Sequence, residues 1–291
     1  MIITGMDTRH VVTLLNDYYS IENTLRRRGY DVKAIEDTLN VIQTSDIFYE
    51  NLKSFHFRQI LKFIYDSEDV ASESAILSKF SSLTPESLSQ KLEVLINEKC
   101  LTKKNGTLYK KLKDKTISRT FEWFISEIIK REMSGIAFSG IKLKGLKSGG
   151  DYDVISRLED AMVHIECKSG SITNVTEDDI THFIGRYKDL APELSILLID
   201  TNGLPDDFKN KFEKVNWKKH GLSVRQPKKR KLKGRGVFYE IFPRVHVITN
   251  DGNLIGNIKL SVNYYFSFVK PYGLIRPGQG YLADYYDEYE T

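Results

Sequence analysis

Apolar residues recur at helical spacing in two stretches in the middle of the chain. Between residues 118 and 129 they stand at positions 121, 124, 125, 128 and 129, which form one face of an α-helix. A second helix is predicted from about Glu177 to Leu190. Thr176 before it is a typical N-cap residue, and Asp179 stands at its third position, where an acid can complete a capping box. Each helix therefore has an apolar face that must pack against another element.

Short apolar runs lie between and after these helices. Gly149-Gly150 leads into a strand that contains Val154 and Ile155, and residues 161–167 form a second strand. The polar turn between the two runs is short, so an antiparallel hairpin is expected. Residues 194–200 are predicted to form a buried strand. This part of the chain is therefore expected to be a mixed α/β domain.

The first half of the chain has a different pattern. Amphipathic helices are predicted at 57–65 and 74–80, and a third begins at Thr84-Pro85 and continues to about residue 98. Residues 101–110 then form a hairpin on an Asn-Gly turn. Three helices followed by a hairpin resemble the winged helix-turn-helix family in order and spacing.

We therefore expect a winged-helix domain over residues 51–115, preceded by a helical segment over residues 1–50. The third helix of this domain is nearly balanced in charge, whereas helices that read the major groove normally carry Arg or Lys. The wing is more basic, with Lys103 and Lys104 in its turn region. Two interpretations stay open: the wing contacts duplex DNA, or the module binds a protein partner or dimerises.

The chain after residue 236 is rich in aromatic and β-branched residues. Strands are predicted at 237–242, 244–248 and 254–258, with an Asp-Gly turn before the last of them. Residues 236–280 are therefore expected to be β-rich. The aromatic residues could stack on unpaired bases, but packing in a β core is the interpretation we favour.

Two acids and a lysine stand at the ends of the predicted hairpin strands. Asp153 opens the first strand, and Glu166 and Lys168 close the second, so all three are expected at the same end. Side chains alternate along a strand, so Glu166 and Lys168 share a face while Cys167 points to the other. Two carboxylates and an ammonium in one small volume suit a divalent cation with a water beside it. A solvated ion pair on an exposed hairpin is the simpler alternative.

These residues resemble the motif of the PD-(D/E)xK nuclease superfamily, whose members have the restriction endonuclease-like fold. Asp153 corresponds to the lone acid and Glu166-Cys167-Lys168 to (D/E)xK, although the proline that names the motif is absent. The resemblance implies an α-β-β-β-α-β core with a mixed central sheet. It also implies a glutamate on the helix before the first strand, for which Glu122 fits best and Glu127 is the alternative.

The resemblance further implies a catalytic set and a cofactor. Glu122, Asp153, Glu166 and the backbone carbonyl of Cys167 would hold Mg²⁺, and Mn²⁺ would be able to substitute. Lys168 would orient the attacking water or offset charge in the transition state. The nuclease domain would span residues 116–291.

Positive charge is concentrated in one segment. From Phe208 to Arg235 the chain carries twelve Lys and Arg against one acid, although the net charge of the whole chain is only +4. This basic loop, residues 208–235, is typical of contact with a phosphate backbone, and a solvated loop is the simpler alternative. The candidate nucleic-acid contacts are Arg186, Lys218, Lys219, Arg225, Lys228, Lys229, Arg230, Lys231, Lys103 and Lys104.

Composition excludes several other classes of protein. With 41% hydrophobic residues and a mean hydropathy of −0.35, the chain has no apolar run near the length of a membrane span. Its first residues also lack a signal-peptide pattern, so we expect a cytoplasmic protein with no membrane partner. Two cysteines form neither a disulfide framework nor a zinc pattern. The sequence has no GxxxxGK(S/T), GxSxG or HExxH motif, so P-loop, α/β-hydrolase and zinc-protease chemistry are not supported.

The sequence thus predicts a metal-dependent nuclease that hydrolyses DNA in a defence, restriction, mobile-element or DNA-processing context. RNA stays open as a substrate. A double-strand cutter needs two active sites, so such an enzyme is expected to form a homodimer. The alternative is a non-catalytic nucleic-acid-binding or regulatory protein, in which the winged helix and the basic loop bind and the nuclease fold is a scaffold.

Overall fold

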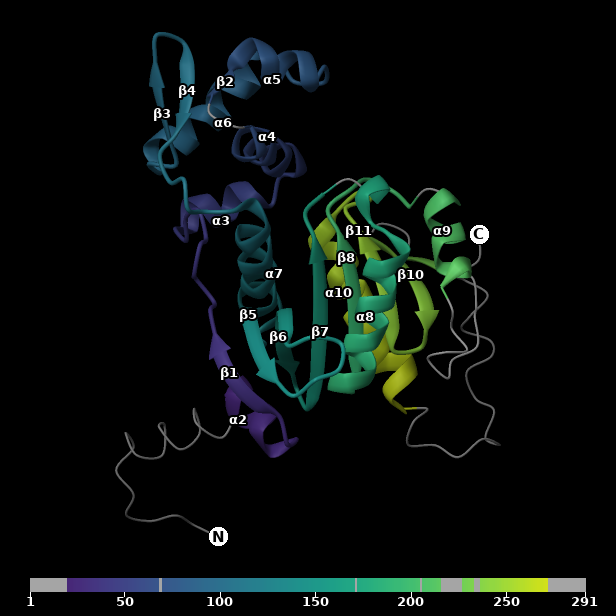
Figure 1. Ribbon diagram of the computed structural model, residues 1–291. Coiled ribbons are helices and arrows are strands. Elements are labelled where there is room, and N and C mark those ends of the chain that lie inside the picture. The colour runs from purple at the N-terminus through teal and green to yellow at the C-terminus, as the bar shows by residue number, and fades with distance from the viewer. Residues whose placement is uncertain are drawn as a thin grey trace, which may run out of the picture.

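A mixed sheet of eight strands forms the centre of the protein (Figure 1). The computed structural model describes residues 20–67, 70–170, 172–204, 206–215, 227–232 and 236–271. The strands of the sheet are β1 (Asp31–Ile35), β5 (Ile136–Lys144), β6 (Asp151–Leu158), β7 (Ala161–Lys168), β8 (Leu194–Ile199), β9 (Lys228–Leu232), β10 (Gly236–Phe242) and β11 (Val245–Thr249).

The strand order is β1-β5-β6-β7-β8-β11-β10-β9. β8 pairs in parallel with β7 on one side and with β11 on the other, and the remaining pairs are antiparallel. The sheet is therefore mixed, and its parallel part lies at its centre, where helices cover both faces.

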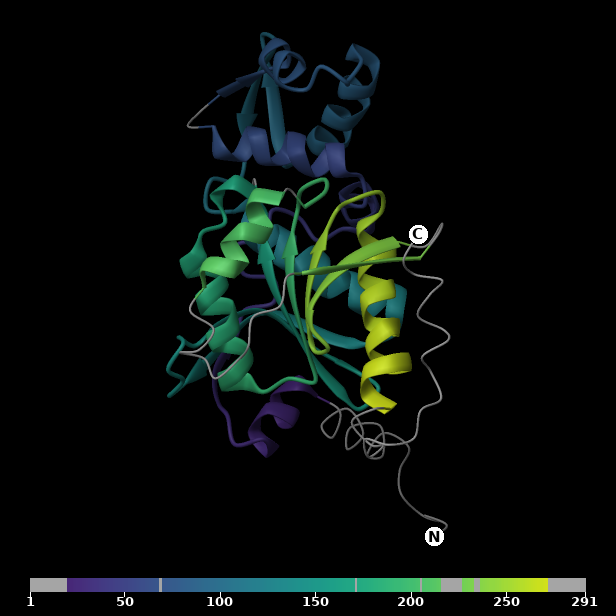
Figure 2. The ribbon, with the colours of Figure 1, turned by 90° about the vertical axis from the view of Figure 1, so that its right-hand side faces the viewer.

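Helices α7 (Ile117–Met133) and α10 (Leu254–Tyr264) pack on one face of the sheet, and α8 (Glu177–Leu190) and α9 (Asp206–Lys214) pack on the other. Figure 2 shows the sheet between these two layers. β8 has only buried residues, because alternate side chains enter the two cores. Its odd-numbered apolar residues join α8 and α9, and its even-numbered ones join α7 and α10.

The order α7-β5-β6-β7-α8-β8 confirms the predicted α-β-β-β-α-β core and the mixed α/β fold class. α8 has the predicted bounds and the predicted capping box between Thr176 and Asp179. A 3₁₀ turn, Ile172–Asn174, connects β7 to this helix. In this region the helix caps and the apolar periodicity of the sequence agree with the tertiary packing, so the predicted elements match the structure.

A smaller unit lies beyond one end of the sheet (Figure 1). We call it the helical module. Its three-stranded sheet has the order β2-β4-β3, and the predicted helices and hairpin are confirmed. Asn105 and Gly106 both have positive φ, at 49° and 76°, as a type I′ hairpin turn requires. The elements are α4 (Phe55–Asp66), β2 (Val70–Ser72), α5 (Glu73–Lys79), α6 (Pro85–Asn97), β3 (Leu101–Lys104) and β4 (Thr107–Lys110).

The prediction of a helical segment over residues 1–50 is wrong for part of its described residues. α2 (Ile21–Arg27) and α3 (Asp46–Leu52) are helices, but β1 lies between them and pairs antiparallel with β5. A five-residue edge strand gives little periodic signal, and its pairing partner lies far along the chain. Residues 1–19 lie outside the described residues.

The prediction of a β-rich segment after residue 236 is only partly right. β10 and β11 confirm the first two strands, but the expected strand at 254–258 lies in α10, and a π-helical turn, Tyr265–Val269, follows. Asn253 explains the difference, because its side chain accepts a hydrogen bond from Gly256 N and caps α10. Isolated β-branched residues then occur at helical spacing and pack on β10 and β11.

The predicted basic loop at 208–235 is also wrong at both ends. Residues 208–214 belong to α9, and residues 228–232 form β9, the edge strand that pairs with β10. The high lysine content makes the helical periodicity at one end, and the strand at the other, hard to recognise in the sequence. No helix within the described ranges is long and apolar enough to cross a membrane.

Candidate active site

The four predicted catalytic side chains line one cavity of about 390 Å³. α7 contributes Glu122, β6 contributes Asp153, and β7 contributes Glu166 and Lys168. Arg186 reaches the same cavity from α8. The described residues that line it are Ser118, Glu122, Asp153, Glu166, Cys167, Lys168, Ser169, Gly170, Asn174, Val175, Asp179 and Arg186.

Glu122, and not Glu127, is the α7 glutamate in this cavity. Glu127 forms ion pairs with Lys130 and Arg131, at 3.0 Å and 2.7 Å, outside the cavity lining. One helical turn and a half separates the two acids, so they point in different directions. The structure thus shows which of the two glutamates lines the cavity.

The end of the β6–β7 hairpin has the predicted alternation. Glu166 forms an ion pair with Arg186 on α8, while the Cys167 side chain packs against the core on the α7 side. Asp153 directly precedes the part of β6 that pairs with β7, and it accepts a hydrogen bond from the backbone N–H of Cys167 at 2.7 Å. This bond fixes the lone acid against the strand that carries Glu166 and Lys168.

The carboxylates in the cavity repel one another. Burial raises the pKa of Asp153 well above its usual value, and the charges of Glu166 and Glu122 raise it further. Burial and the charge of Glu166 also raise the pKa of Glu122, against the opposing effect of Arg119. Such a set of buried oxygen donors is chemically suited to a hard divalent cation, whose charge would offset the repulsion.

Two arginines already contact these acids. Arg186 donates a hydrogen bond to Glu166, and Arg119 Nη1 donates to Glu122 Oε2 at 2.7 Å. Among the described residues, no three His, Cys, Asp or Glu side chains are gathered closely enough to form a complete metal site. The donor chemistry fits a cation, but two of the acids are engaged by guanidinium groups in this arrangement.

Lys168 is held by an acid that the sequence did not single out for this role. Its Nζ lies 2.9 Å from Asp179 Oδ1 and 3.5 Å from Glu166 Oε1. Burial acts to lower the pKa of Lys168, but the hydrogen bond with Asp179 and the charge of Glu166 outweigh it and raise that pKa. The side chain is therefore an ammonium at neutral pH, which makes it a hydrogen-bond donor and not a base. The capping box revealed Asp179, but only the packing of α8 beside β7 reveals its second partner.

His164 lies buried beneath Glu166. Its Nδ1 is 2.9 Å from Ser195 Oγ, and its Nε2 lies 3.8 Å from Glu166 Oε2 without a hydrogen-bond partner. Burial lowers the pKa of His164 to about 4, so the ring is neutral at physiological pH. A neutral imidazole adds no charge to the site, so the positive charges beside these carboxylates come from Arg119, Lys168 and Arg186.

The position of Glu122 depends on residues far away in the sequence. Arg119 donates to Glu122 and also to Glu36 Oε2 at 2.9 Å, just after β1. Gly140 leaves room for this guanidinium, because a Cβ there would lie 2.6 Å from Arg119 Nη1. The N-terminal strand thus helps to orient a candidate catalytic acid. No local sequence signal could have shown this.

The predicted nucleic-acid contacts are dispersed. Lys228, Lys229 and Lys231 are exposed on β9, and Lys104 is exposed at the tip of the β3–β4 hairpin. Lys103 is exposed too, but it pairs with Glu73. Lys218, Lys219 and Arg225 lie outside the described residues.

Arg230 does not fit the predicted phosphate contact. It is 8% exposed, its Nη2 lies 2.6 Å from Glu240 Oε2, and its guanidinium stacks 5.3 Å from the centre of the Tyr264 ring. Alternation along β9 turns this side chain toward α10. Arg230 is therefore part of the packing between the edge strand and α10.

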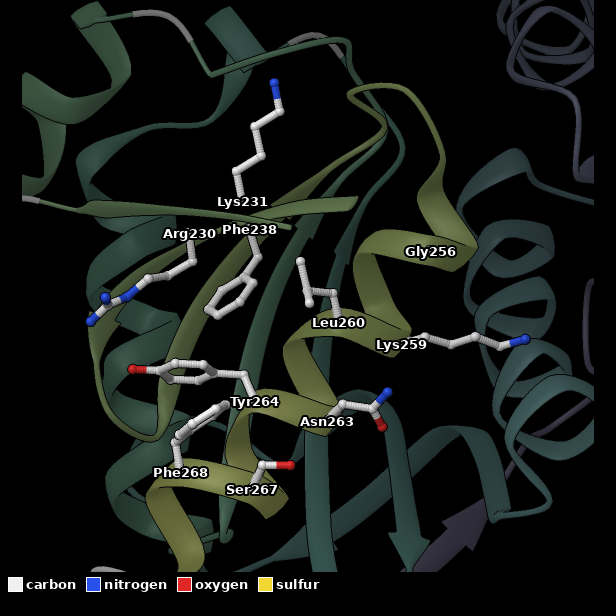
Figure 3. Close-up of a pocket in the computed structure, with 10 residues that line it drawn as sticks. All are labelled: Arg230, Lys231, Phe238, Gly256, Lys259, Leu260, Asn263, Tyr264, Ser267 and Phe268. Atoms are coloured by element: carbon white, nitrogen blue, oxygen red, sulfur yellow. The ribbon is translucent and has the colours of Figure 1, made fainter. Parts of the chain in front are cut away.

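A second cavity, of about 490 Å³, lies between β9, β10 and α10 (Figure 3). The rings of Phe238, Tyr264 and Phe268 follow one another along it. Phe238 and Tyr264 are buried, which agrees with the interpretation of the C-terminal aromatics as core residues. No carboxylate belongs to the described lining, so this cavity offers no oxygen-rich cation site.

Comparison with known proteins gives only distant similarities. No family model and no curated protein matches the chain. Among solved structures, protein VC1899 from Vibrio cholerae is similar at 12% identity, over 76% of this chain and 57% of that protein, with a TM-score of 0.43. Can2 from Sulfobacillus thermosulfidooxidans, in complex with cyclic tetra-adenylate, is similar at 11% identity, over 66% and 54%, also at 0.43. The chain therefore spans little more than half the length of either protein, and at this level of similarity neither tells us what it does.

Proposed function

We propose that this protein is a metal-dependent nuclease that hydrolyses phosphodiester bonds, with DNA as the expected substrate. One observation carries the proposal: three carboxylates and a protonated lysine, from three separate elements, line one open cavity. Burial and mutual repulsion raise the pKa values of Asp153 and Glu122, which is a common feature of catalytic sites.

The residues have distinct roles in this proposal. Asp153, Glu166, Glu122 and the backbone carbonyl of Cys167 would hold Mg²⁺, and Mn²⁺ would substitute for it. The bound ion would polarise a phosphoryl oxygen and lower the pKa of a water molecule. To accept such an ion, Glu122 and Glu166 would have to loosen their pairs with Arg119 and Arg186.

Lys168 would stabilise the transition state. Its ammonium group remains charged at neutral pH, and Asp179 holds it at the cavity. An ammonium group placed there would donate to the phosphoryl oxygens as their negative charge grows, or to the attacking water. Because Lys168 stays protonated, it would not take the proton that the water loses.

The test is cleavage of plasmid, linear duplex, single-stranded and branched DNA and of RNA, with Mg²⁺, Mn²⁺ or EDTA. We expect cleavage by the wild-type protein only with a divalent ion, and a loss of roughly 100-fold or more in Asp153→Asn and in Lys168→Met. Glu127→Gln is the matched control for Glu122→Gln, because both change a glutamate of α7 and only Glu122 lines the cavity. Calorimetric titration with Mn²⁺ adds a readout that does not depend on cleavage.

Two results would contradict the proposal. One is a wild-type protein that cuts none of these substrates with either ion. The other is an equal loss of activity in Glu127→Gln and Glu122→Gln, since the cavity would then not be the active site.

A second candidate is a nucleic-acid-binding protein without catalysis. It is favoured by the pairs between Arg186 and Glu166 and between Arg119 and Glu122, which neutralise two acids without a metal ion. This candidate predicts DNA binding that weakens steeply with salt, together with no cleavage and no Mn²⁺ binding.

We further propose that the helical module recognises a binding partner of the nuclease, which is either DNA or a protein. Its order of elements supports a winged-helix assignment. The exposed residues of α6 include Glu86, Glu93 and Asn97 and offer little to a phosphate backbone, so either the hairpin with Lys104 contacts DNA or the module binds protein. If the enzyme cuts both strands of a duplex, a homodimer would supply the second site.

A further inference from the structure

A buried ion pair joins the helical module to the central sheet. Arg58 of α4 and Asp200, which follows β8, have side chains only 2% and 3% exposed. Arg58 Nε lies 2.9 Å from Asp200 Oδ2, and Nη2 lies 2.7 Å from Oδ1, so the contact is bidentate. Nη2 also donates to Asn250 Oδ1 at 2.8 Å, and Nη1 donates to the carbonyl of Leu52 at 2.6 Å.

We call Arg58, Asp200 and Asn250 the junction. The space left beside it is about 10 Å³, which is hardly enough for one water molecule. Charges buried this completely are weak evidence for a gain in stability, because desolvation offsets much of their attraction. A role in fixing one arrangement of the two units accounts for them better.

Asp200 of the junction contacts the backbone of Lys168, the proposed catalytic lysine. The backbone N–H of Asp200 donates to the carbonyl of Lys168 at 2.9 Å, which extends the parallel β7–β8 pairing past its last matched residues, Lys168 and Ile199. Gln59 Nε2, also on α4, donates to the Asp200 carbonyl at 3.4 Å. Two residues of α4, Arg58 and Gln59, therefore bind Asp200, and Asp200 in turn binds the backbone of Lys168.

The chain around Lys168 needs such support. After Lys168 it leaves the strand at Ser169, and strand ends open more readily than strand centres. The described contacts of Ser169 include one to Ser118 Oγ, at a long 3.3 Å between hydroxyl oxygens. The side chain of Lys168 is tied to Asp179 and Glu166, but its backbone is tied to β8 through Asp200.

We propose that Arg58, Asp200 and Asn250 are positioning residues, which lock α4 onto the ends of β8 and β11 and thereby keep Lys168 in place for hydrolysis. The inference deepens the proposed nuclease function and rests on it. On this proposal the helical module has two roles: it recognises a partner, and through α4 it positions an active-site residue. A partner that shifts α4 would change the rate of cleavage.

The test compares Arg58→Met and Asp200→Asn with Arg28→Met. Arg28 is the control because it also joins separate elements through a carboxylate, Glu193 at 2.8 Å, but it is partly exposed and does not line the cavity. All variants are assayed below their unfolding temperatures. We expect kcat to fall about 10- to 100-fold in the first two with little change in KM, since small misplacements at a site have effects of this size. Arg28→Met should keep the wild-type kcat.

A double variant, Arg58→Met with Asp200→Leu, separates positioning from stability. Apolar residues can replace a buried ion pair without loss of stability. We expect the double variant to regain thermal stability relative to the single ones, while kcat stays low. A kcat that recovers together with the stability would overturn the proposal, because the junction would then only support the fold.

Hydrogen exchange at the Asp200 amide gives a readout that does not need catalysis. We expect this amide to exchange at least about 10-fold faster in Arg58→Met and to be unchanged in Arg28→Met. Wild-type protection in Arg58→Met overturns the positioning role. If the wild-type protein cuts nothing, the nuclease proposal fails, and the exchange result still decides whether α4 holds the strand end.

Discussion

At the scale of single residues, Asp153 shows how a candidate catalytic group opposes the stability of the fold. Its pKa is raised, so the native state binds its proton more tightly than the unfolded chain does. Above the unfolded value near 3.8, the charged form therefore makes the folded state less stable. The carboxylate lowers the free energy of unfolding at neutral pH and has no such effect at strongly acidic pH.

We therefore expect Asp153→Asn to raise the stability of the metal-free protein while it abolishes cleavage. Asparagine can still accept the hydrogen bond from Cys167 N. A gain of about 1 kcal/mol would raise Tm by roughly 2–4 °C at pH 7. Thermal unfolding in EDTA from pH 3 to pH 8 should show the gain shrink as the pH approaches 3.8. A variant less stable than the wild type at pH 7 would contradict the repulsion.

Asp179 has the opposite linkage to pH. Burial alone would raise its pKa, but hydrogen bonds from Lys168 and Thr176 lower it to about 2. Its contribution to stability is therefore complete above the unfolded value of 3.8 and is lost as the pH falls through about 2.

We expect Asp179→Asn to cost about 1 kcal/mol at pH 7, a figure reduced for the partial exposure of the side chain, and to lower kcat because Lys168 loses its anchor. Urea unfolding at pH 7 and at pH 2 measures the first effect, which should diminish at the lower pH. Asp178→Asn changes an exposed neighbour in the same helical turn and should alter neither quantity. Equal losses in the two variants would argue against the bond to Lys168.

At the scale of elements, β5 carries an irregularity that serves the site. Ser139 pairs with Val154 and Ile141 with Tyr152, which leaves Gly140 without a partner on β6. Gly140 has φ of +62°, and Arg119 lies where its Cβ would be. β5 thus makes space for the guanidinium that holds Glu122.

Gly140→Ala should therefore destabilise the protein and reduce cleavage. Gly145→Ala is the matched control, because Gly145 also has positive φ, +77°, but nothing lies within 4 Å of its Cβ position. Both variants should lose about 1 kcal/mol from backbone strain, and only Gly140→Ala should lose more than this and also lower kcat. Urea unfolding and cleavage rates measure the difference. If Gly145→Ala reduces cleavage as much, displacement of Arg119 is not the cause.

The edge strand β9 carries exposed lysines and one buried arginine. Lys231 is exposed, whereas Arg230 is buried against Glu240 and Tyr264. We expect Lys231→Gln to weaken DNA binding and reduce the salt dependence, by roughly one unit of slope if the lysine meets a phosphate, without a change in Tm. Arg230→Gln should lower Tm. Binding at several salt concentrations, with thermal unfolding, tests both, and the reverse pattern would mean that Arg230 is the phosphate contact.

At the scale of the whole molecule, residues 20–50 pack with the central sheet, and β1 is one of its strands. Ile21, Leu25 and Val32 pack in a core with residues of β5, β6 and β7. Phe48 and Tyr49 join the core that α7 also enters. A domain boundary near residue 50 therefore does not coincide with a break in packing.

A chain shortened to begin at Ser54 should for this reason fail to fold as a stable soluble protein. It would expose the edge of β5 and lose Glu36, one of the partners of Arg119. Each buried apolar side chain that is removed contributes about 1.5–3 kcal/mol. Soluble yield and thermal unfolding are the measurements, and a shortened chain with wild-type Tm would support the predicted boundary at residue 50.

The sequence by itself determined the central helices, the hairpin that carries the acids, the capping box of α8 and the order of the core elements. These features depend on periodicity, caps and turn residues that lie within one or two turns of each other. It also identified Asp153, Glu166 and Lys168 as one group, because their hairpin is local.

Only the tertiary structure showed that Glu122, and not Glu127, lines the cavity. It also showed that β1 is a strand of the sheet and that residues 254–258, predicted as a strand, belong to α10. It also brought together Arg119 with Glu36 and Arg58 with Asp200, which are 83 and 142 residues apart in the chain. Contacts at such separations leave no periodic trace in a single sequence. They arise when packed elements bring their side chains together, which is why the support of the site, unlike its motif, could not be predicted.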